Sequence, residues 1–260
     1  MYDTRPKKSL GQHWLHDELS LVAMVQSGMV NDRDTVVEIG PGLGTLTKYL
    51  VDNAKRVIAL EFDQDLARQL PSRVPSKNLQ TIHADCLTYN YSELPAGYKV
   101  VANIPYYLTS NLLRVLSEAP NPPAVITLLV QKEVAERVAA VPGDMSLLSV
   151  SVQLYYQATL GELVPANLFT PPPKVDSQII TLVRREEPLF PDLDTKKFFR
   201  VVKAGFAQRR KKLRSSLSAG LRISKDEATE LLEKAQIDPN CRPQELSLQQ
   251  WYSLYEQADA

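Results

Sequence analysis

Short apolar runs alternate along this chain with longer segments in which apolar residues recur every three or four positions. The short runs predict strands over residues 35–40, 57–61, 80–84, 99–103, 124–130, 148–157 and 177–184. Helical periodicity lies between most of them, as at 45–54, 109–118 and 131–140. Because strands alternate with helices, we expect an α/β fold whose mainly parallel sheet is covered on both faces.

The C-terminal part of the chain has a different pattern. Only a proline-rich loop at 165–173 separates the last two expected strands, which predicts an antiparallel edge to the sheet. A second proline-rich stretch at 187–191 indicates a linker. Helical patterns follow, with Ser224 and Ser247 placed as N-caps, over residues 194–220, 224–235 and 246–258. With 260 residues, 44% of them hydrophobic, we expect an α/β domain over 1–187 and a small all-α domain over 188–260.

A glycine-rich turn follows the first expected strand. The strand runs through Glu38 into Gly40, Gly42 and Gly44, and the next strand ends at Glu61. Glycine lets backbone approach a ligand closely, and a carboxylate at that strand end can accept hydrogen bonds from both ribose hydroxyls. Such a turn alone can serve a purely steric purpose, but the acid at this offset favours a nucleoside site. The spacing differs from that of pyrophosphate-binding turns and resembles motif I of class I S-adenosylmethionine methyltransferases.

A second motif follows the strand at 99–103, which runs directly into Asn103-Ile104-Pro105-Tyr106. An adenine amino nitrogen is a poor nucleophile because its lone pair is delocalised into the ring. The Asn103 side-chain oxygen and a main-chain carbonyl at Ile104 or Pro105 could bind its hydrogens and direct the lone pair at a methyl group. Tyr106 offers an aromatic face to an extruded base. The tetrapeptide resembles the N-P-P-Y motif of methyltransferases acting on planar amino groups, although a strand that simply ends at a proline turn has the same outline.

Three further segments, 7–15, 169–177 and 206–214, extend the resemblance. They are similar to the K-x-S-L-G-Q-N/H-F-L, F-x-P-P-P-x-V-x-S and F-x-Q-R-R-K-x-L segments of the ribosomal RNA adenine dimethylase family. With five motifs in family order, the chain is identified as a member of this family, and its likeness is greatest to members that modify the small subunit. The resemblance implies a Rossmann-like class I methyltransferase fold, a seven-stranded sheet with a reversed last strand, and S-adenosylmethionine as cofactor.

The resemblance also implies roles for individual residues. The expected cofactor-binding residues are His13, Leu15, Gly40, Gly42, Glu61, Asp85 and Asn103. In the family, the residue matching Gly40 lies against the methionine portion of the cofactor. The residue matching Glu61 binds the ribose, and the residue matching Asp85 binds the adenine amino group. His13 and Trp14 stand where many relatives have Asn and Phe, which leaves open whether His13 contacts the cofactor through backbone or ring.

The same likeness yields the expected catalytic residues, which are Asn103, Ile104, Pro105, Tyr106 and Phe169. In related adenine methylases, an aromatic residue before the proline run packs on the base opposite the tyrosine of the tetrapeptide. Phe169 occupies that position, and its alternative role is to anchor the proline loop in the core.

Charge is balanced overall but unevenly distributed. Residues 181–222 carry twelve Lys and Arg against four Asp and Glu, whereas 223–260 carry three against eight. Such asymmetry is typical of a polyanion binder, although a basic run alone can be a solvated face. We expect a helix at 196–207 to continue through the basic run. The expected RNA-binding residues are Lys7, Lys8, Arg209, Arg210, Lys211, Lys212 and Arg214.

Together these patterns predict an enzyme that dimethylates N6 of two adjacent adenosines near the 3′ end of small-subunit ribosomal RNA, either free or in a pre-30S particle. Two alternatives stay open: a large-subunit adenine methylase of the macrolide-resistance type, and a non-catalytic RNA-binding assembly factor. The two cysteines, Cys86 and Cys241, lack metal or disulfide spacing, and no apolar run or leader pattern indicates a membrane. We therefore expect a metal-free, monomeric, cytoplasmic protein.

Overall fold

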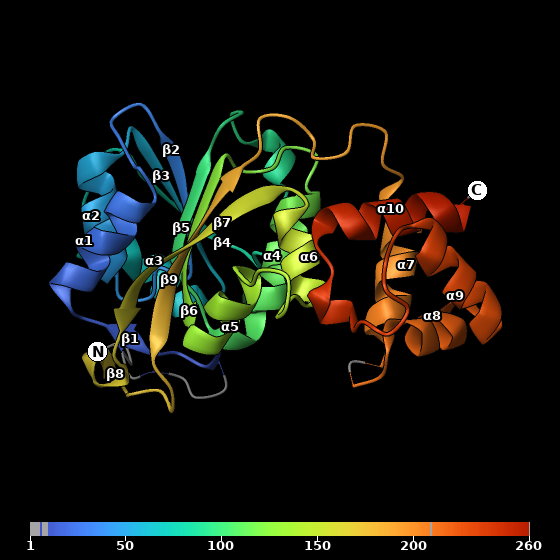
Figure 1. The fold of residues 1–260 in the computed structure, drawn as a ribbon. Coiled ribbons are helices and arrows are strands. Elements are labelled where there is room, and N and C mark those ends of the chain that lie inside the picture. The colour runs from blue at the N-terminus through green and yellow to red at the C-terminus, as the bar shows by residue number, and fades with distance from the viewer. Residues whose placement is uncertain (1–5, 7–9, 209, 260) are drawn as a thin grey trace. The chain divides into compact units, whose positions relative to one another are not determined.

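The structure is a computed structural model that describes residue 6 and residues 10–208 and 210–259. The chain forms two compact units (Figure 1). The first comprises Met1–Glu136 and Tyr156–Arg184, and the second comprises Arg137–Tyr155 and Arg185–Ala260. Within the described residues, no helix is long and apolar enough to cross a membrane.

A seven-stranded sheet with the order β4-β3-β2-β5-β6-β9-β7 organises the first unit. The strands are β2 (Thr35–Ile39), β3 (Arg56–Glu61), β4 (Leu79–His83), β5 (Lys99–Asn103), β6 (Val125–Gln131), β7 (Tyr156–Val164) and β9 (Ser177–Arg184). The neighbours from β4 to β6 pair in parallel, whereas β9 is antiparallel to both β6 and β7. The expected sheet with one reversed strand is thereby confirmed.

Helices lie on both sides of this sheet. The helices are α1 (Glu18–Ser27), α2 (Thr45–Asn53), α3 (Gln64–Arg73), α4 (Thr109–Glu118) and α5 (Lys132–Val138). In Figure 1, α1 and α2 lie on one side of the sheet and α4 on the other. A separate two-stranded sheet joins β1 (Trp14–Leu15) to β8 (Phe169–Thr170), so the start of the described chain is tied to the proline loop.

The expected strand at 148–157 is wrong over most of its length. Residues 147–153 form helix α6 (Leu147–Gln153), and the strand begins only at Tyr156. Ser146 and Ser149 exchange side-chain and backbone hydrogen bonds in a capping box, which starts the helix. The alternation of Val150, Val152 and Leu154 suggested a strand, but i,i+4 spacing also places Val150 and Leu154 together in the core of the second unit.

The second unit is helical, as expected. Besides α6 it contains α7 (Thr195–Phe206), α8 (Leu213–Leu221), α9 (Lys225–Lys234) and α10 (Leu248–Asp259) around a core that includes Phe198, Leu217 and Trp251. The predicted N-caps Ser224 and Ser247 accept hydrogen bonds from Glu227 N and Gln250 N. Residues 137–155 also belong to this unit, because Met145, Val150 and Leu154 pack in its core. The predicted domains, 1–187 and 188–260, had placed this segment in the first domain.

The expected continuous helix over 194–220 is also wrong, because the chain turns between α7 and α8. Leu213 and Leu217 of α8 and Val202 of α7 are fully buried in one core, which requires α8 to fold back on α7. The two helices approach closely at Gly220, where an added Cβ would lie 2.6 Å from Ala204. A straight helix could not bury both apolar stripes in one core.

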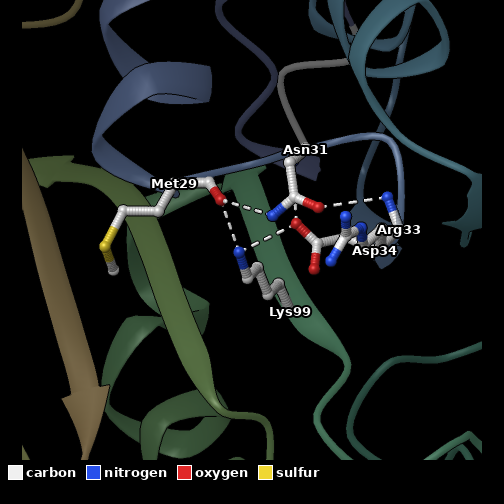
Figure 2. A network of polar contacts seen from close by, with 5 residues as sticks. All are labelled: Met29, Asn31, Arg33, Asp34 and Lys99. Atoms are coloured by element: carbon white, nitrogen blue, oxygen red, sulfur yellow. Dashed lines mark hydrogen bonds and ion pairs between the residues drawn. The ribbon is translucent and has the colours of Figure 1, made fainter.

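A buried charge network lies at the amino ends of β2 and β5, opposite the strand ends expected to bind the ligand. Lys99 Nζ forms an ion pair with Asp34 at 2.8 Å and donates to the Met29 carbonyl (Figure 2). Asp34 also accepts from Asn31 N at 2.8 Å, and Asn31 Oδ1 accepts from Arg33 N. The Lys99 and Asp34 side chains are only 11% and 14% exposed. This network fastens the α1–β2 connection to the sheet.

We expect Lys99→Ala to lower the free energy of unfolding by about 2–3 kcal/mol, because it leaves the Asp34 carboxylate and a carbonyl nearly buried without their cation. Urea unfolding followed by circular dichroism measures this. Arg114→Ala is the control, because it removes an ion pair whose partners are 60% and 52% exposed, and such pairs contribute about 0–1 kcal/mol. Equal losses in the two variants would contradict the structural role of Lys99.

Candidate active site

A cavity of about 290 Å³ opens at the carboxyl ends of β2, β3 and β5. Carboxyl ends of parallel strands are where open α/β sheets bind ligands. Every residue that the sequence assigned to the cofactor lines this cavity: His13, Leu15, Gly40, Gly42, Glu61, Asp85 and Asn103. Ile104, Pro105 and Tyr106 line it as well. The structure therefore brings together segments that lie up to about ninety residues apart in the sequence.

The glycine turn is open to the cavity at Gly40, whereas the Trp14 ring packs against its backbone at Gly42. Gly40 has a φ of +67°, and an added Cβ there would meet nothing within 4 Å. Gly42 has a φ of +55°, and its Cβ would lie 2.4 Å from the Trp14 ring. Residues other than glycine are disfavoured at both positions because φ is positive. The turn thus presents bare backbone to the cavity at Gly40 and accommodates the indole of Trp14 at Gly42.

Glu61 is held in place by the turn that it faces. Its Oε2 accepts from Gly42 N at 3.1 Å, and its Oε1 accepts from Asp63 N at 2.9 Å. The side chain is 5% exposed, and burial raises the pKa of its carboxyl above the ordinary value, against the lowering effect of these backbone hydrogen bonds. Each oxygen keeps a second lone pair for a ligand hydroxyl.

A second buried acid, Glu38, also lines the cavity, and sequence reasoning gave it no role. It is 1% exposed, and Oε2 has no hydrogen-bond partner in the part of the chain that the structure describes. Burial raises the pKa of this carboxyl to about 8; the nearby Thr47 hydroxyl opposes that rise, and the neighbouring Glu61 adds to it. Its place in the Glu38-x-Gly40 spacing was the available signal. A buried, unpartnered acceptor at a cavity wall is suited to a cationic or donor group of a ligand.

Asp85 and Cys86 form the next part of the wall, just after β4. Asp85 Oδ1 accepts from Leu87 N at 2.8 Å, which fixes the carboxylate, while Oδ2 accepts no hydrogen bond from the described residues. Burial raises the pKa of the neighbouring Cys86 thiol to about 11, so it stays protonated near neutral pH. The wall here offers one oriented acceptor and a small apolar neighbour.

The Asn103-Ile104-Pro105-Tyr106 segment ends β5 at the cavity. The Asn103 amide makes no hydrogen bond with any residue that the structure describes, although its neighbours are packed: Ile104 is fully buried and Tyr106 is partly buried. The Pro105 carbonyl accepts from Leu108 N at 3.0 Å, which favours the Ile104 carbonyl as the second free acceptor. Tyr106 is fixed by a 2.7 Å hydrogen bond between its hydroxyl and Ser177 Oγ, and burial raises the pKa of its hydroxyl.

The structure places Phe169 away from the other expected catalytic residues. Its side chain is 3% exposed, packs in the core of the first unit with Leu15 and Ile179, and does not line the cavity. In backbone register, Phe169 pairs with Leu15 across the small β1–β8 sheet. Of the two weighed roles, the structure shows the core anchor.

Sequence reasoning assigned no role to three aromatic residues that line this cavity. Trp14 covers Gly42, whereas Phe62 and Tyr107 line the cavity with 60% and 63% of their surface exposed. Phe62 and Tyr107 each follow a residue that had been singled out, which was the only signal for them. Among the described residues, no group of His, Cys, Asp and Glu could hold a metal ion.

The basic run lies in the second unit. Arg210, Lys211 and Lys212 are exposed in the turn before α8, and Lys212 Nζ donates to Asn240 Oδ1 at 2.7 Å. Arg214 is partly exposed on the first turn of α8. Lys7, Lys8 and Arg209 lie outside the described residues.

Comparison with known proteins gives a consistent result. The family model described as ribosomal RNA adenine dimethylase matches residues 4–260. Ribosomal RNA small subunit methyltransferase A of Dehalococcoides mccartyi is 39% identical over 257 residues, covering 97% of this chain and 88% of the relative.

Two solved structures resemble most of the chain. The dimethyladenosine transferase of Plasmodium falciparum has a TM-score of 0.79 at 25% identity and covers 92% of this chain and 95% of its own. The 23S rRNA methyltransferase ErmE has a TM-score of 0.76 at 29% identity and covers 95% of this chain and 100% of its own.

Proposed function

The chain belongs to the ribosomal RNA adenine dimethylase family, and from this we propose that it dimethylates N6 of two adjacent adenosines near the 3′ end of small-subunit ribosomal RNA. It is an S-adenosylmethionine-dependent methyltransferase with an RNA substrate. The observation that carries the proposal is the unpartnered Asn103 amide at the wall of a cavity that also holds Glu38, Glu61 and Asp85.

The cavity fits S-adenosylmethionine, which supplies a reactive methyl group on a sulfonium centre. The orphaned Glu38 oxygen suits the cationic methionine portion, and the bare backbone at Gly40 leaves room beside it. Glu61 has oxygens fixed for two ribose hydroxyls, and Asp85 has one free oxygen for the adenine amino group. Leu15 and the backbone at His13 and Gly42 complete the cofactor side of the cavity.

The residues on the other side suit an adenine amino group. Asn103 Oδ1 and the Ile104 carbonyl accept its two hydrogens, which withdraws the nitrogen lone pair from the ring and directs it toward the cofactor. Pro105 holds the segment rigid, and Tyr106 stacks on the extruded base. A strong base is unnecessary because the proton becomes acidic only after the nitrogen has been alkylated.

The preference for the small subunit rests on overall likeness. The curated relative named for the small subunit is 39% identical, whereas the solved 23S rRNA methyltransferase is 29% identical. The large-subunit reaction is therefore the second candidate. We further propose that the protein acts as a cytoplasmic monomer on the assembling small subunit.

Purified protein incubated with labelled S-adenosylmethionine and unmethylated small or large subunits, followed by nucleoside analysis, tests this proposal. Label recovered as N6,N6-dimethyladenosine from the small subunit is the expected result. Label in the large subunit alone would replace the proposal with the second candidate. RNA binding without label in either would favour a non-catalytic assembly role.

We also propose that the exposed run of Arg210, Lys211 and Lys212, with Arg214 and with Lys7, Lys8 and Arg209, binds RNA phosphates. Lys211→Gln should weaken binding and reduce the slope of log affinity against log salt concentration by about 1. Filter binding across a salt series measures this. Lys225→Gln is the matched control, because Lys225 is an exposed lysine on α9 within the acidic end of the chain. Equal effects of both substitutions would exclude a specific role for the run.

A further inference from the structure

The core position of Phe169 leaves one face of the proposed base site without its expected aromatic partner. Tyr106 lines the cavity and offers one face, but the Phe169 ring is buried with Leu15 and Ile179. Another aromatic ring does face Tyr106. His13 lines the same cavity, and its imidazole is partly exposed.

The two rings have the mutual orientation of a clamp. The His13 and Tyr106 ring centroids are 6.0 Å apart, and the ring planes differ by only 16°. A planar base between two rings makes van der Waals contact of about 3.5 Å with each, so it needs a separation of about 7 Å. The rings must therefore part by at least about 1 Å to admit a base. Histidine is among the side chains on which unpaired RNA bases stack.

The proline loop holds the His13 ring, and the first residue of β9 holds the Tyr106 ring. His13 Nδ1 donates to the Pro171 carbonyl at 2.7 Å, and the Tyr106 hydroxyl is hydrogen-bonded to Ser177 Oγ at 2.7 Å. The pairing of Trp14 with Thr170 in the β1–β8 sheet fixes the chain next to His13. These contacts set the plane of each ring, and the clamp requires the partly exposed imidazole to move away from Tyr106 when a base enters.

We propose that His13 supplies the second stacking face for the target adenine, opposite Tyr106, and that the proline loop acts by holding this imidazole rather than by presenting Phe169. The inference rests on the proposed function of the cavity. It also assigns the ring of His13 to the base and leaves only its backbone to the cofactor.

Four variants test this clamp. His13→Ala should lower kcat/KM for the ribosomal substrate about 10-fold or more, the range expected for loss of one base stack, while the affinity for S-adenosylhomocysteine changes less than twofold. His13→Phe keeps a planar face and should retain most activity. His16→Ala is the matched control, because His16 is exposed and does not line the cavity. Phe169→Leu should leave base stacking intact.

A binding readout makes the test independent of turnover. With S-adenosylhomocysteine present, unmodified protein should bind a single-stranded RNA containing the target adenosine more tightly than one with an abasic site there. His13→Ala should remove most of that difference, and His13→Phe should keep it. If the unmodified protein methylates neither subunit, the proposed function fails, but this comparison still decides the clamp.

Three results would overturn the inference. The first is a loss of S-adenosylhomocysteine affinity in His13→Ala with normal turnover at saturating cofactor. The second is equal impairment by Phe and Ala, which would assign the effect to the Pro171 hydrogen bond. The third is loss of adenine discrimination in Phe169→Leu and not in His13→Ala.

Discussion

Asn103→Ala should lower kcat about 100- to 1000-fold while the protein remains folded. That is the range found when one preorganised polar contact to the reacting group is removed. The Asn103 amide is partly buried at the cavity wall and makes no hydrogen bond to any described residue, so its loss should cost little stability. Its oxygen is the acceptor that turns a planar amino group into a nucleophile, so its absence affects the methyl-transfer step most.

Single-turnover methylation of small subunits at saturating cofactor measures this loss directly. Asn53→Ala is the matched control, since it removes an exposed amide from the end of α2 whose hydrogen bond within the described part of the chain is to the Tyr49 carbonyl. Equilibrium dialysis with S-adenosylhomocysteine separates binding from chemistry. If the single-turnover rate of Asn103→Ala at saturating cofactor equalled that of the unmodified protein while its S-adenosylhomocysteine affinity fell, Asn103 would be a binding residue and the proposed positioning role would be wrong.

The local sequence was sufficient to predict those parts of the fold and site in which a residue type at a strand end has one usual structural role. The glycine turn, the acid at Glu61 and the strand ending at Asn103 were predictable because bare backbone, a fixed carboxylate and a strand end follow from local sequence. The segment 148–157 was not, because Val150, Val152 and Leu154 satisfy both periodicities and only the core of the second unit selects the helix.

Tertiary contacts decide the remaining differences. The break before α8 depends on Leu213 and Leu217 sharing a core with α7, which no local window contains. The burial of Phe169 and the parallel approach of His13 to Tyr106 both depend on β1 pairing with β8, across more than 150 residues of sequence. Site residues set by strand ends were therefore accessible from sequence, whereas the arrangement of rings around the base was not.

Glu61→Gln should weaken S-adenosylhomocysteine binding about 10- to 100-fold, because both carboxylate oxygens already serve the backbone and both face the ribose site. Glutamine offers only one acceptor, so its NH₂ group would oppose either Gly42 N–H or Asp63 N–H. Isothermal titration calorimetry measures the loss. Glu133→Gln, on α5 and exposed, controls for removal of a carboxylate.

The same measurement across pH separates the two buried acids. Burial raises the pKa of Glu61 and raises that of Glu38 to about 8 in the free protein. Ligand hydroxyls and a positive charge favour the ionised forms, so binding lowers both pKa values and releases protons. S-adenosylhomocysteine affinity should therefore rise with pH through about 8, the pKa of Glu38, and become constant only above that value, once both groups are ionised. Glu38→Gln should remove the part of that rise near pH 8. An affinity that fell as pH rose toward 8 would show that the carboxyls bind the cofactor in their protonated forms.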